Sequence, residues 1–198
     1  MQALKGVTVL DESDGCRDRH SGVWCNGMEG YVQVYTGDGK GKTTAALGLA
    51  LRAAGAGLRV LFAQFVKGME YSEMKALQRF ADLITVRQYG RGCFIYGEPA
   101  AEDCAVARSG LDDVRAALVS GDFDLVIMDE GNIATSVGLF SVRELLDVMA
   151  ARPADVELVI TGRDADPRVI AAADLVTEMR EIKHYYQQGV QARIGIEK

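Results

Sequence analysis

After Met28 the sequence alternates regularly between short runs rich in Val, Ile and Leu and longer segments of helical periodicity. This alternation constrains the fold strongly, because it is typical of βαβ units, in which parallel strands form one sheet and helices cover its faces. The expected strands are 31–36, 59–66, 83–89, 123–129, 156–161 and 174–179. The sequence therefore predicts an α/β fold with a mostly parallel sheet of about six strands flanked by helices.

Three of the segments between the expected strands carry an apolar stripe at helical spacing, which predicts a helix packed on the sheet. Gly55 is expected to end the first helix, and Ser141 with Glu144 forms a capping box at the start of the third. The stripes comprise residues 46, 47, 50, 51 and 54 in the first helix, 107, 111, 114 and 118 in the second, and 142, 145, 146 and 149 in the third.

The chain has 198 residues, of which 48% are hydrophobic, and this is enough for about one domain with a sizeable core. Residues 11–30 differ from the rest, because they mix Asp, Ser, Gly, Arg and Asn without helical or strand periodicity. We therefore expect an irregular N-terminal extension over residues 1–27 and a single domain over residues 28–198.

The net charge is −6, from 22 basic and 28 acidic residues, so the overall field repels a phosphate polymer. No apolar run is long enough to cross a bilayer, and the amino terminus lacks the layout of a signal peptide. These features argue against nucleic-acid and membrane partners and predict a cytoplasmic protein. Any bound anion must then be held by local geometry.

Four cysteines, Cys16, Cys25, Cys93 and Cys104, show no CxxC spacing, and sparse cysteine without an export signal usually indicates reduced thiols. Cys16, His20 and Cys25 offer three metal ligands, but a structural zinc site needs four, and this spacing fits no familiar zinc pattern. We interpret the three residues as free side chains in a loose segment.

Residues 36–44, TGDGKGKTT, form a glycine-rich loop between the first expected strand and the first expected helix. Its Gly-Lys-Thr ending is typical of a phosphate-binding P-loop, although Thr36 stands where the standard pattern has its first glycine. Backbone N–H groups would bind phosphate oxygens, with Lys42 supplying a point charge and Thr43 a hydroxyl for Mg²⁺. The simpler alternative is a glycine-rich turn without a ligand, but a turn requires neither the lysine nor the hydroxyl.

Residues 123–130 form an apolar run that ends in two carboxylates, Asp129 and Glu130, which is the layout of a Walker B segment. The carboxyl ends of parallel strands meet at one edge of a sheet, where ligands of open α/β folds bind. Arg163, after the fifth expected strand, is a candidate for a phosphate contact at that edge. These residues predict a nucleotide site, but they leave open whether the nucleotide is attacked at its γ-phosphate or at its ribose C5′.

From about residue 29 to residue 198 the chain resembles the ATP:corrinoid adenosyltransferases, a P-loop family with a RecA-like domain. The resemblance rests on motifs in a fixed order: TGDGKGKTT at 36–44, AQFVKG at 63–68, GRG at 90–92, DE at 129–130, TGR at 161–163, and a tail from KH at 183–184 to GI at 195–196. Such an enzyme adenosylates a corrinoid in the synthesis or salvage of adenosylcobalamin. The first alternative is a P-loop kinase or ATPase of RecA-like type that acts at the γ-phosphate, and the second is a nucleotide-dependent switch with no chemistry of its own.

The resemblance implies a cob(I) nucleophile that attacks C5′ of Mg-ATP and releases tripolyphosphate, with no side chain acting as a general base. It implies catalytic roles for Lys42, Thr43 and Glu130. Mg²⁺ would be held by Thr43 and Glu130 with support from Asp129. The implied contacts to the nucleotide come from Gly37, Asp38, Gly39, Lys40, Gly41, Lys42, Thr43, Thr44, Gln64 and Arg163.

The resemblance also implies three partners besides ATP: a corrinoid substrate, a second copy of the chain in a homodimer, and a flavoprotein-type reductase for cob(II). Well-known members place a Phe-x-Trp pair against the corrin. Phe94 and Tyr96 have the same spacing in a shifted register, so we expect them to contact the corrin ring; packing on the sheet edge is the alternative. Relatives commonly begin near the position of Glu29, which implies that Met28 is the natural start.

Overall fold

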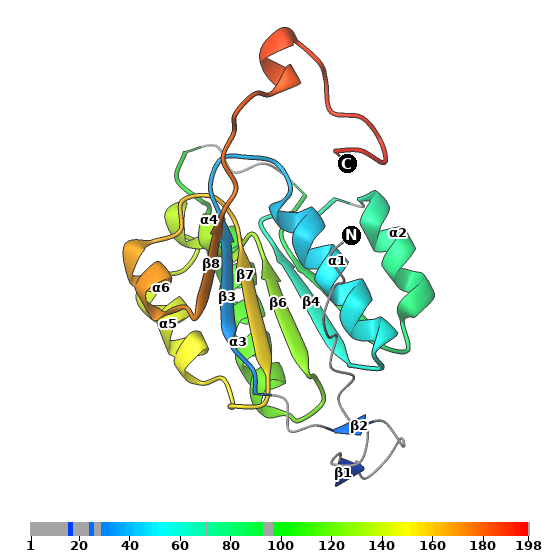
Figure 1. Cartoon of the computed structure of the whole chain (residues 1–198). Coiled ribbons are helices and arrows are strands. Elements are labelled where there is room, and N and C mark those ends of the chain that lie inside the picture. Colours follow the sequence, from blue (N-terminus) through cyan, green and yellow to red (C-terminus); the bar gives the residue numbers. More distant parts are fainter. Residues whose placement is uncertain (1–15, 18–23, 26–28, 70, 93–96, 198) are drawn as a thin grey trace, which may run out of the picture.

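The computed structural model describes residues 16–17, 24–25, 29–69, 71–92 and 97–197. Its main sheet has six strands in the order β5-β4-β6-β7-β3-β8, and every neighbouring pair is parallel (Figure 1). The strands are β3 (Val32–Thr36), β4 (Val60–Phe65), β5 (Ile84–Tyr89), β6 (Leu125–Asp129), β7 (Glu157–Thr161) and β8 (Leu175–Glu178). The predicted α/β fold is confirmed, and it is consistent with a single RecA-like P-loop domain.

Helices connect and cover these strands. They are α1 (Lys42–Gly55), α2 (Ser72–Leu77), α3 (Ala101–Val119), α4 (Gly131–Ser136), α5 (Val142–Ala150) and α6 (Pro167–Ala172), with short 3-10 helices η2 (Gln78–Phe80) and η3 (Tyr185–Gln188). The expected capping box of α5 is confirmed, because the Ser141 hydroxyl accepts from the Glu144 N–H and the Glu144 carboxylate accepts from the Ser141 N–H. The observed bounds of each main-sheet strand differ from the expected ones by at most two residues.

Two further strands precede residue 28, within the segment predicted to be irregular. β1 (Cys16–Arg17) and β2 (Trp24–Cys25) pair antiparallel with each other and form a separate sheet. We expected no strand in this segment, and the expectation was wrong for these four residues. Two-residue strands are too short to produce the alternation from which a strand is predicted.

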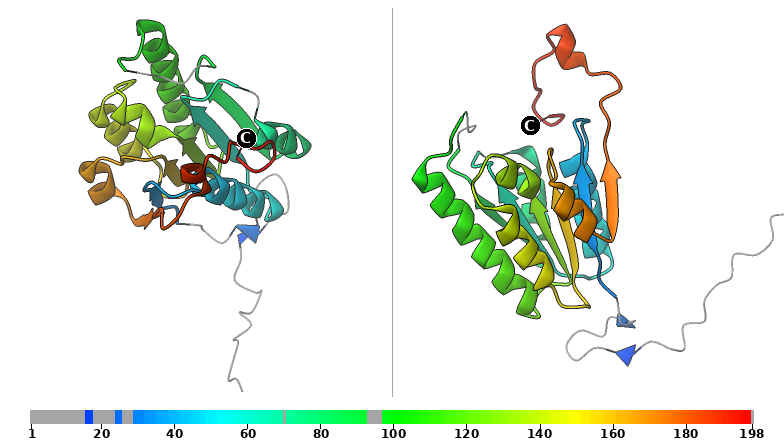
Figure 2. Two further views of the ribbon diagram at one scale, coloured as in Figure 1. Left: turned by 90° about the horizontal axis from the view of Figure 1, so that it is seen from above. Right: turned by 90° about the vertical axis from the view of Figure 1, so that its left-hand side faces the viewer.

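Helices cover both faces of the main sheet (Figure 2), and alternate residues of the central strands belong to the two core clusters under these layers. On β4, Val60 and Phe62 pack in the cluster that includes α1 and α2, whereas Leu61 and Phe65 pack in the cluster that includes α3, α5 and α6. Both faces of the sheet are therefore covered. This explains why the sequence shows uninterrupted apolar runs rather than alternation between apolar and polar residues.

The α1 helix departs from the predicted stripe at one residue. Leu51 was expected to face the sheet, but 45% of its surface is exposed. The buried face of α1 consists of small residues, Ala46, Ala50, Ala53 and Ala54, which let the helix axis approach the sheet closely. Because that alanine face is in contact with the strands, Leu51 lies to its side.

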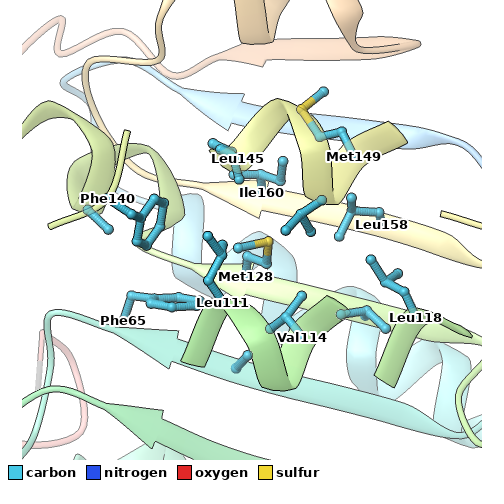
Figure 3. Packing of buried hydrophobic residues seen from close by; sticks show 14 of the residues in the cluster. Phe65, Leu111, Val114, Leu118, Met128, Phe140, Leu145, Met149, Leu158 and Ile160 are labelled. Atoms are coloured by element: carbon cyan, nitrogen blue, oxygen red, sulfur yellow. The ribbon is translucent and has the colours of Figure 1, made fainter. Parts of the chain in front are cut away.

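The larger core cluster fills the space between the sheet and the helices α3 and α5 (Figure 3). Leu111, Val114 and Leu118 of α3 are all buried there, as their spacing predicted, in the same cluster as Met128 of β6. The centroids of the Phe65 and Phe140 rings lie 5.5 Å apart in an edge-to-face arrangement, close to the carboxyl end of β4. Apolar packing thus continues up to the edge of the sheet that holds the polar residues described below.

The contact between α3 and β5 depends on a glycine. A Cβ atom at Gly110 would lie 2.3 Å from Cγ of the Tyr89 ring, which packs over this helix position. Tyr89 also donates to Asp113 at 2.9 Å, and burial with this hydrogen bond raises the pKa of Tyr89 to about 12. The Tyr89 ring is therefore in contact with Gly110 and fixed by its hydrogen bond to Asp113. It cannot move away from a methyl group added at position 110.

We expect Gly110→Ala to lower the free energy of unfolding by about 1–3 kcal/mol through overpacking, even though alanine favours the helix. Gly48→Ala is the matched control, because Gly48 lies inside α1 with nothing within 4 Å of an added Cβ atom. It should raise stability by about 1 kcal/mol. Urea unfolding of both variants measures the difference, and equal stabilisation by both would contradict the described packing.

Candidate functional site

The glycine-rich loop leaves the sheet at Thr36, the last residue of β3, and ends where α1 begins. Gly37 has φ +92° and Gly41 has φ +121°, conformations that L side chains rarely adopt. Thr36 stays in the strand, and its carbonyl accepts from the N–H of Met179 at 2.8 Å. The turn therefore begins one residue later than in the standard pattern, which explains why no glycine is needed at position 36.

The loop also packs closely against the segment that follows β8. A Cβ atom would lie 2.5 Å from the Met179 carbonyl oxygen if added at Gly37, and 2.7 Å from it if added at Gly39. The N–H of Gly39 donates to the same carbonyl at 2.6 Å. Glycine is thus required at both positions by close backbone approach.

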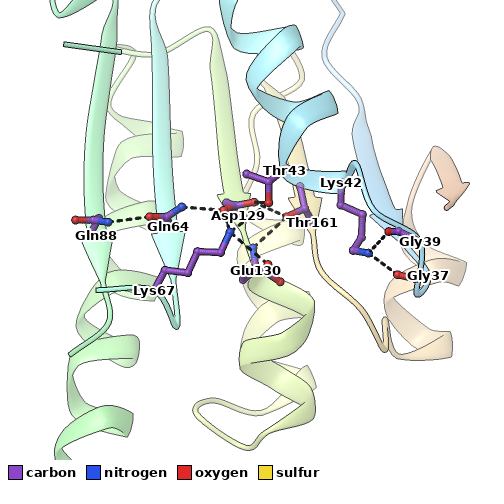
Figure 4. A network of polar contacts seen from close by, with 10 residues as sticks. All are labelled: Gly37, Gly39, Lys42, Thr43, Gln64, Lys67, Gln88, Asp129, Glu130 and Thr161. Atoms are coloured by element: carbon purple, nitrogen blue, oxygen red, sulfur yellow. Dashed lines mark hydrogen bonds and ion pairs between the residues drawn. The ribbon is translucent and has the colours of Figure 1, made fainter. Parts of the chain in front are cut away.

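Lys42, at the start of α1, directs its ammonium group into this loop (Figure 4). Nζ donates to the carbonyl oxygens of Gly37 at 2.5 Å and Gly39 at 2.8 Å. Burial lowers the pKa of Lys42, and the nearby Arg163 guanidinium lowers it further. The ammonium is therefore held by neutral carbonyl groups rather than by a carboxylate, and an incoming anion would be a stronger partner.

Asp129, the last residue of β6, lies at the centre of the site and is fully buried. Its two carboxylate oxygens accept hydrogen bonds from four side chains (Figure 4). These are Thr43 and Thr161 to Oδ1, both at 2.8 Å, and Gln64 at 3.1 Å and Lys67 at 3.0 Å to Oδ2. A buried carboxylate requires such donors, and here they come from α1, β7 and β4 and from the segment after β4.

Glu130 differs from its neighbour in conformation and surroundings. Its backbone adopts φ +61°, and its N–H donates to the Thr161 hydroxyl at 3.0 Å. The Glu130 carboxylate remains partly exposed and lies 3.4 Å from Lys67 Nζ. The predicted acid pair thus divides into one buried, fully hydrogen-bonded carboxylate and one that is partly exposed and paired with Lys67.

Lys67 follows β4 and was not among the predicted site residues. Its Nζ lies 3.0 Å from Asp129 Oδ2, 3.4 Å from Glu130 Oε1 and 3.3 Å from the Thr43 hydroxyl. Burial alone would lower the pKa of Lys67, but the two carboxylates outweigh it and raise the pKa. The sequence signal was present, because Lys67 lies in the segment directly after a strand, at the edge where ligands were expected.

Gln64 was expected to contact the nucleotide, and the structure places it deeper. Its side chain is fully buried in β4, donates to Asp129, and accepts from Gln88 of β5 at 2.8 Å. Gln88 in turn also donates to the carbonyl of Met69 at 3.1 Å. A chain of amides therefore connects the edge strand with Asp129, and Gln88 is a further residue that sequence reasoning missed.

Several predicted residues lie at the rim of the site. Asp38, Lys40, Thr44 and Arg163 are exposed. Phe94 and Tyr96 lie outside the described residues, as do His20 and Cys93. The predictions made for these four residues therefore stay predictions.

The C-terminal tail, residues 180–197, lies above the carboxyl edge of the sheet (Figures 1 and 2). Lys40 of the glycine-rich loop donates to the Ile196 carbonyl at 3.0 Å and contacts the Glu197 carboxylate at 3.3 Å. Glu197 also pairs with Arg193 at 3.0 Å and accepts from Tyr185. The tail motifs and the glycine-rich loop, far apart in the sequence, thus meet at one site.

Oxygen atoms of Thr43, Asp129 and Glu130 all lie close to the ammonium group of Lys67. Hydroxyl and carboxylate oxygens are the ligands that Mg²⁺ prefers in proteins. The residues present therefore fit the metal ion that the resemblance implies.

Among the helices that the structure describes, none has the length and apolar composition needed to cross a membrane.

Thr161 ties the two acids together, because its hydroxyl donates to Asp129 and accepts from Glu130. We expect Thr161→Val, which keeps the volume but removes both hydrogen bonds, to cost about 1–3 kcal/mol of unfolding free energy. Thr161→Ser keeps the hydroxyl and should cost less, about 1 kcal/mol for a lost methyl group. Urea unfolding compares the two; a serine variant less stable than the valine variant would refute this role of the hydroxyl.

Residues 28–197 match the model of the family described as ATP:corrinoid adenosyltransferase BtuR/CobO/CobP. The chain is 36% identical over 169 residues to the corrinoid adenosyltransferase of Pseudomonas aeruginosa, an alignment that covers 85% of this chain and 83% of the relative. It is 34% identical over 170 residues to the corrinoid adenosyltransferase of Escherichia coli strain K12, with 85% of each chain covered.

The corrinoid adenosyltransferase CobA of Salmonella typhimurium is similar at 33% identity over 170 residues, again with 85% of each chain covered. The matched region contains the glycine-rich loop, the acid pair and the tail that the fold brings together. With a family model matched over residues 28–197 and these relatives aligned over most of their length, the chain belongs to the ATP:corrinoid adenosyltransferase family.

Proposed function

We propose that the protein transfers the 5′-deoxyadenosyl group of ATP to the cob(I) centre of a corrinoid and releases tripolyphosphate. The observation that carries the proposal is the meeting of Lys42, Thr43 and the acid pair at one edge of the sheet, in a chain of this family. The alternative of a kinase or ATPase acting at the γ-phosphate is not favoured by family membership.

The reaction makes one bond and breaks one. The electron pair of the cob(I) substrate forms a bond to C5′, the C5′–oxygen bond breaks, and its electrons leave with the tripolyphosphate. No proton is transferred in this step, so no general base is required. The task of the protein is to position C5′ and to stabilise the negative charge of the leaving group.

The residues of the site suit this task. The ammonium of Lys42 exchanges its carbonyl partners for phosphate oxygens, and the exposed guanidinium of Arg163 approaches the same phosphates. Thr43 and Glu130 would hold Mg²⁺, and Asp129 would orient the Thr43 hydroxyl by accepting its hydrogen bond. When bound, the metal ion supplies further neutralisation of the triphosphate. Gln64 acts through Asp129 rather than on the nucleotide.

We propose further that Phe94 and Tyr96 contact the corrin, and that a flavoprotein-type reductase supplies the electron that reduces cob(II) to cob(I).

The enzyme would work in the cytoplasm as a homodimer. Its domain would span residues 28–198, with residues 1–27 as an extension before Met28; the start of the family match at residue 28 supports this division.

Lys42→Ala should reduce adenosyl transfer from ATP to chemically reduced cob(I) by about 10²–10³-fold, because the variant loses a charge-assisted contact to the leaving group. Lys75→Ala, which removes a lysine from the exposed face of α2, is the control and should keep wild-type activity. Tripolyphosphate as the product formed from ATP supports the proposed reaction. ADP as the product would show the kinase or ATPase alternative instead.

Phe94→Ala and Tyr96→Ala test the corrin contact. If the rings contact the corrin and stabilise cob(II) without its lower ligand, the reductase-coupled reaction should fall far more than transfer to chemically reduced cob(I). ATP affinity, measured as a control, should change little. Equal losses in the two assays would mean that the side chains only pack on the sheet edge.

A further inference from the structure

Lys67 places a positive charge inside the oxygen cluster that fits a metal ion. Its side chain is 19% exposed, and its ammonium nitrogen lies within 3.4 Å of oxygen atoms of Thr43, Asp129 and Glu130. These are the three residues assigned to Mg²⁺ above. Since Mg²⁺ binds its oxygen ligands at about 2.1 Å, the ion and the ammonium cannot both occupy the position seen here.

The backbone holds Lys67 in this orientation. The N–H of Lys67 donates to the Phe65 carbonyl at 2.6 Å, which makes a three-residue turn around Val66. Val66 has φ +65°, a rare conformation for a β-branched residue. The next residue, Gly68, is packed so tightly that an added Cβ atom would lie 2.2 Å from the Gly92 nitrogen. Such strain persists only where surrounding structure enforces it, and it is characteristic of functional sites.

The Lys67 ammonium group offsets part of the negative charge of the metal-binding residues. Two carboxylates, Asp129 and Glu130, lie close to the ammonium group of Lys67, and Lys42 adds a second positive charge nearby. A divalent cation entering alone would meet a like charge at short range in a partly buried place. A divalent cation bound to ATP brings phosphate charges that offset this repulsion.

We propose that Lys67 is a positioning residue that acts as an internal counter-ion for the metal site. Before the nucleotide binds, its ammonium group holds Thr43, Asp129 and Glu130 together and prevents a free divalent cation from binding. The metal ion then enters only together with ATP, and the ammonium moves aside. This inference rests on the proposed function only in its assignment of the metal site, and no corrinoid is needed to test it.

The test is a titration with Mn²⁺, followed by its electron paramagnetic resonance signal, in the absence of nucleotide and corrinoid. Lys67→Met removes the charge and should bind Mn²⁺ at least tenfold more tightly than the wild-type protein. Lys67→Arg keeps the charge and should bind Mn²⁺ as weakly as the wild type. Lys75→Met removes an exposed lysine charge from α2 and is the matched control, which should also bind as the wild type does.

Equal Mn²⁺ affinity in Lys67→Met and the wild type would overturn the inference, as would an equal gain in Lys75→Met. The wild-type protein provides a second test that does not depend on the folding of a variant. With ATP present, the wild-type protein should bind Mn²⁺ with an affinity at least tenfold higher than the affinity of ATP for Mn²⁺ in the absence of protein. If the nucleotide-free wild-type site already binds Mn²⁺ with the affinity seen in the presence of ATP, the inference fails.

These outcomes are separate from those of the adenosyl transfer assay. A protein that forms tripolyphosphate but shows equal Mn²⁺ binding in all variants supports the proposed function and refutes the role of Lys67. A protein that forms no tripolyphosphate, yet gains Mn²⁺ affinity only in Lys67→Met, refutes the proposed function and supports the internal counter-ion.

Discussion

The buried carboxylate of Asp129 is the interaction on which the rest of the site depends. A charge in this position is tolerated only if donors surround it, and the four donors come from different parts of the chain. To supply them, the first turn of α1, the ends of β4 and β7 and the segment after β4 must all approach the end of β6. One carboxylate thus fixes the relative positions of the groups that would contact the nucleotide.

The parallel sheet makes this convergence possible, because all its strands end at the same edge. The α1 helix begins after β3 and crosses β7 and β6 on its way to β4. That path places Thr43 beside Asp129, although the two residues are 86 positions apart. The alanine face of α1 belongs to the same arrangement, since small side chains let the helix lie close enough to the strands for the hydroxyl to reach the carboxylate.

Much of this was predictable from the sequence, and the exceptions have physical reasons. The strands, the α3 stripe and the capping box of α5 follow from local periodicity and spacing, which single segments carry. Leu51 was misplaced because the predicted stripe joined it to the alanines, whereas the small alanine side chains alone set the depth of the contact between α1 and the sheet. Lys67 and Thr161 lie where the sequence predicted ligands, at the carboxyl ends of strands, but nothing local to them indicates that they bond to Asp129. Gln88 was missed because its role arises from pairing across strands, through its hydrogen bond to Gln64.

Two lysines of the site have opposite electrostatic surroundings, and this difference separates their roles. Burial lowers the pKa of Lys42, whose partners are neutral carbonyl groups, whereas two carboxylates raise the pKa of Lys67. A triphosphate would relieve the unfavourable burial of the Lys42 charge, so that lysine gains most from the nucleotide. Lys67 already has its anionic partners, and a phosphate must compete with them. Under the two proposals, the positive charge that would attract ATP and the one that would hold the metal-site residues together are carried by different residues.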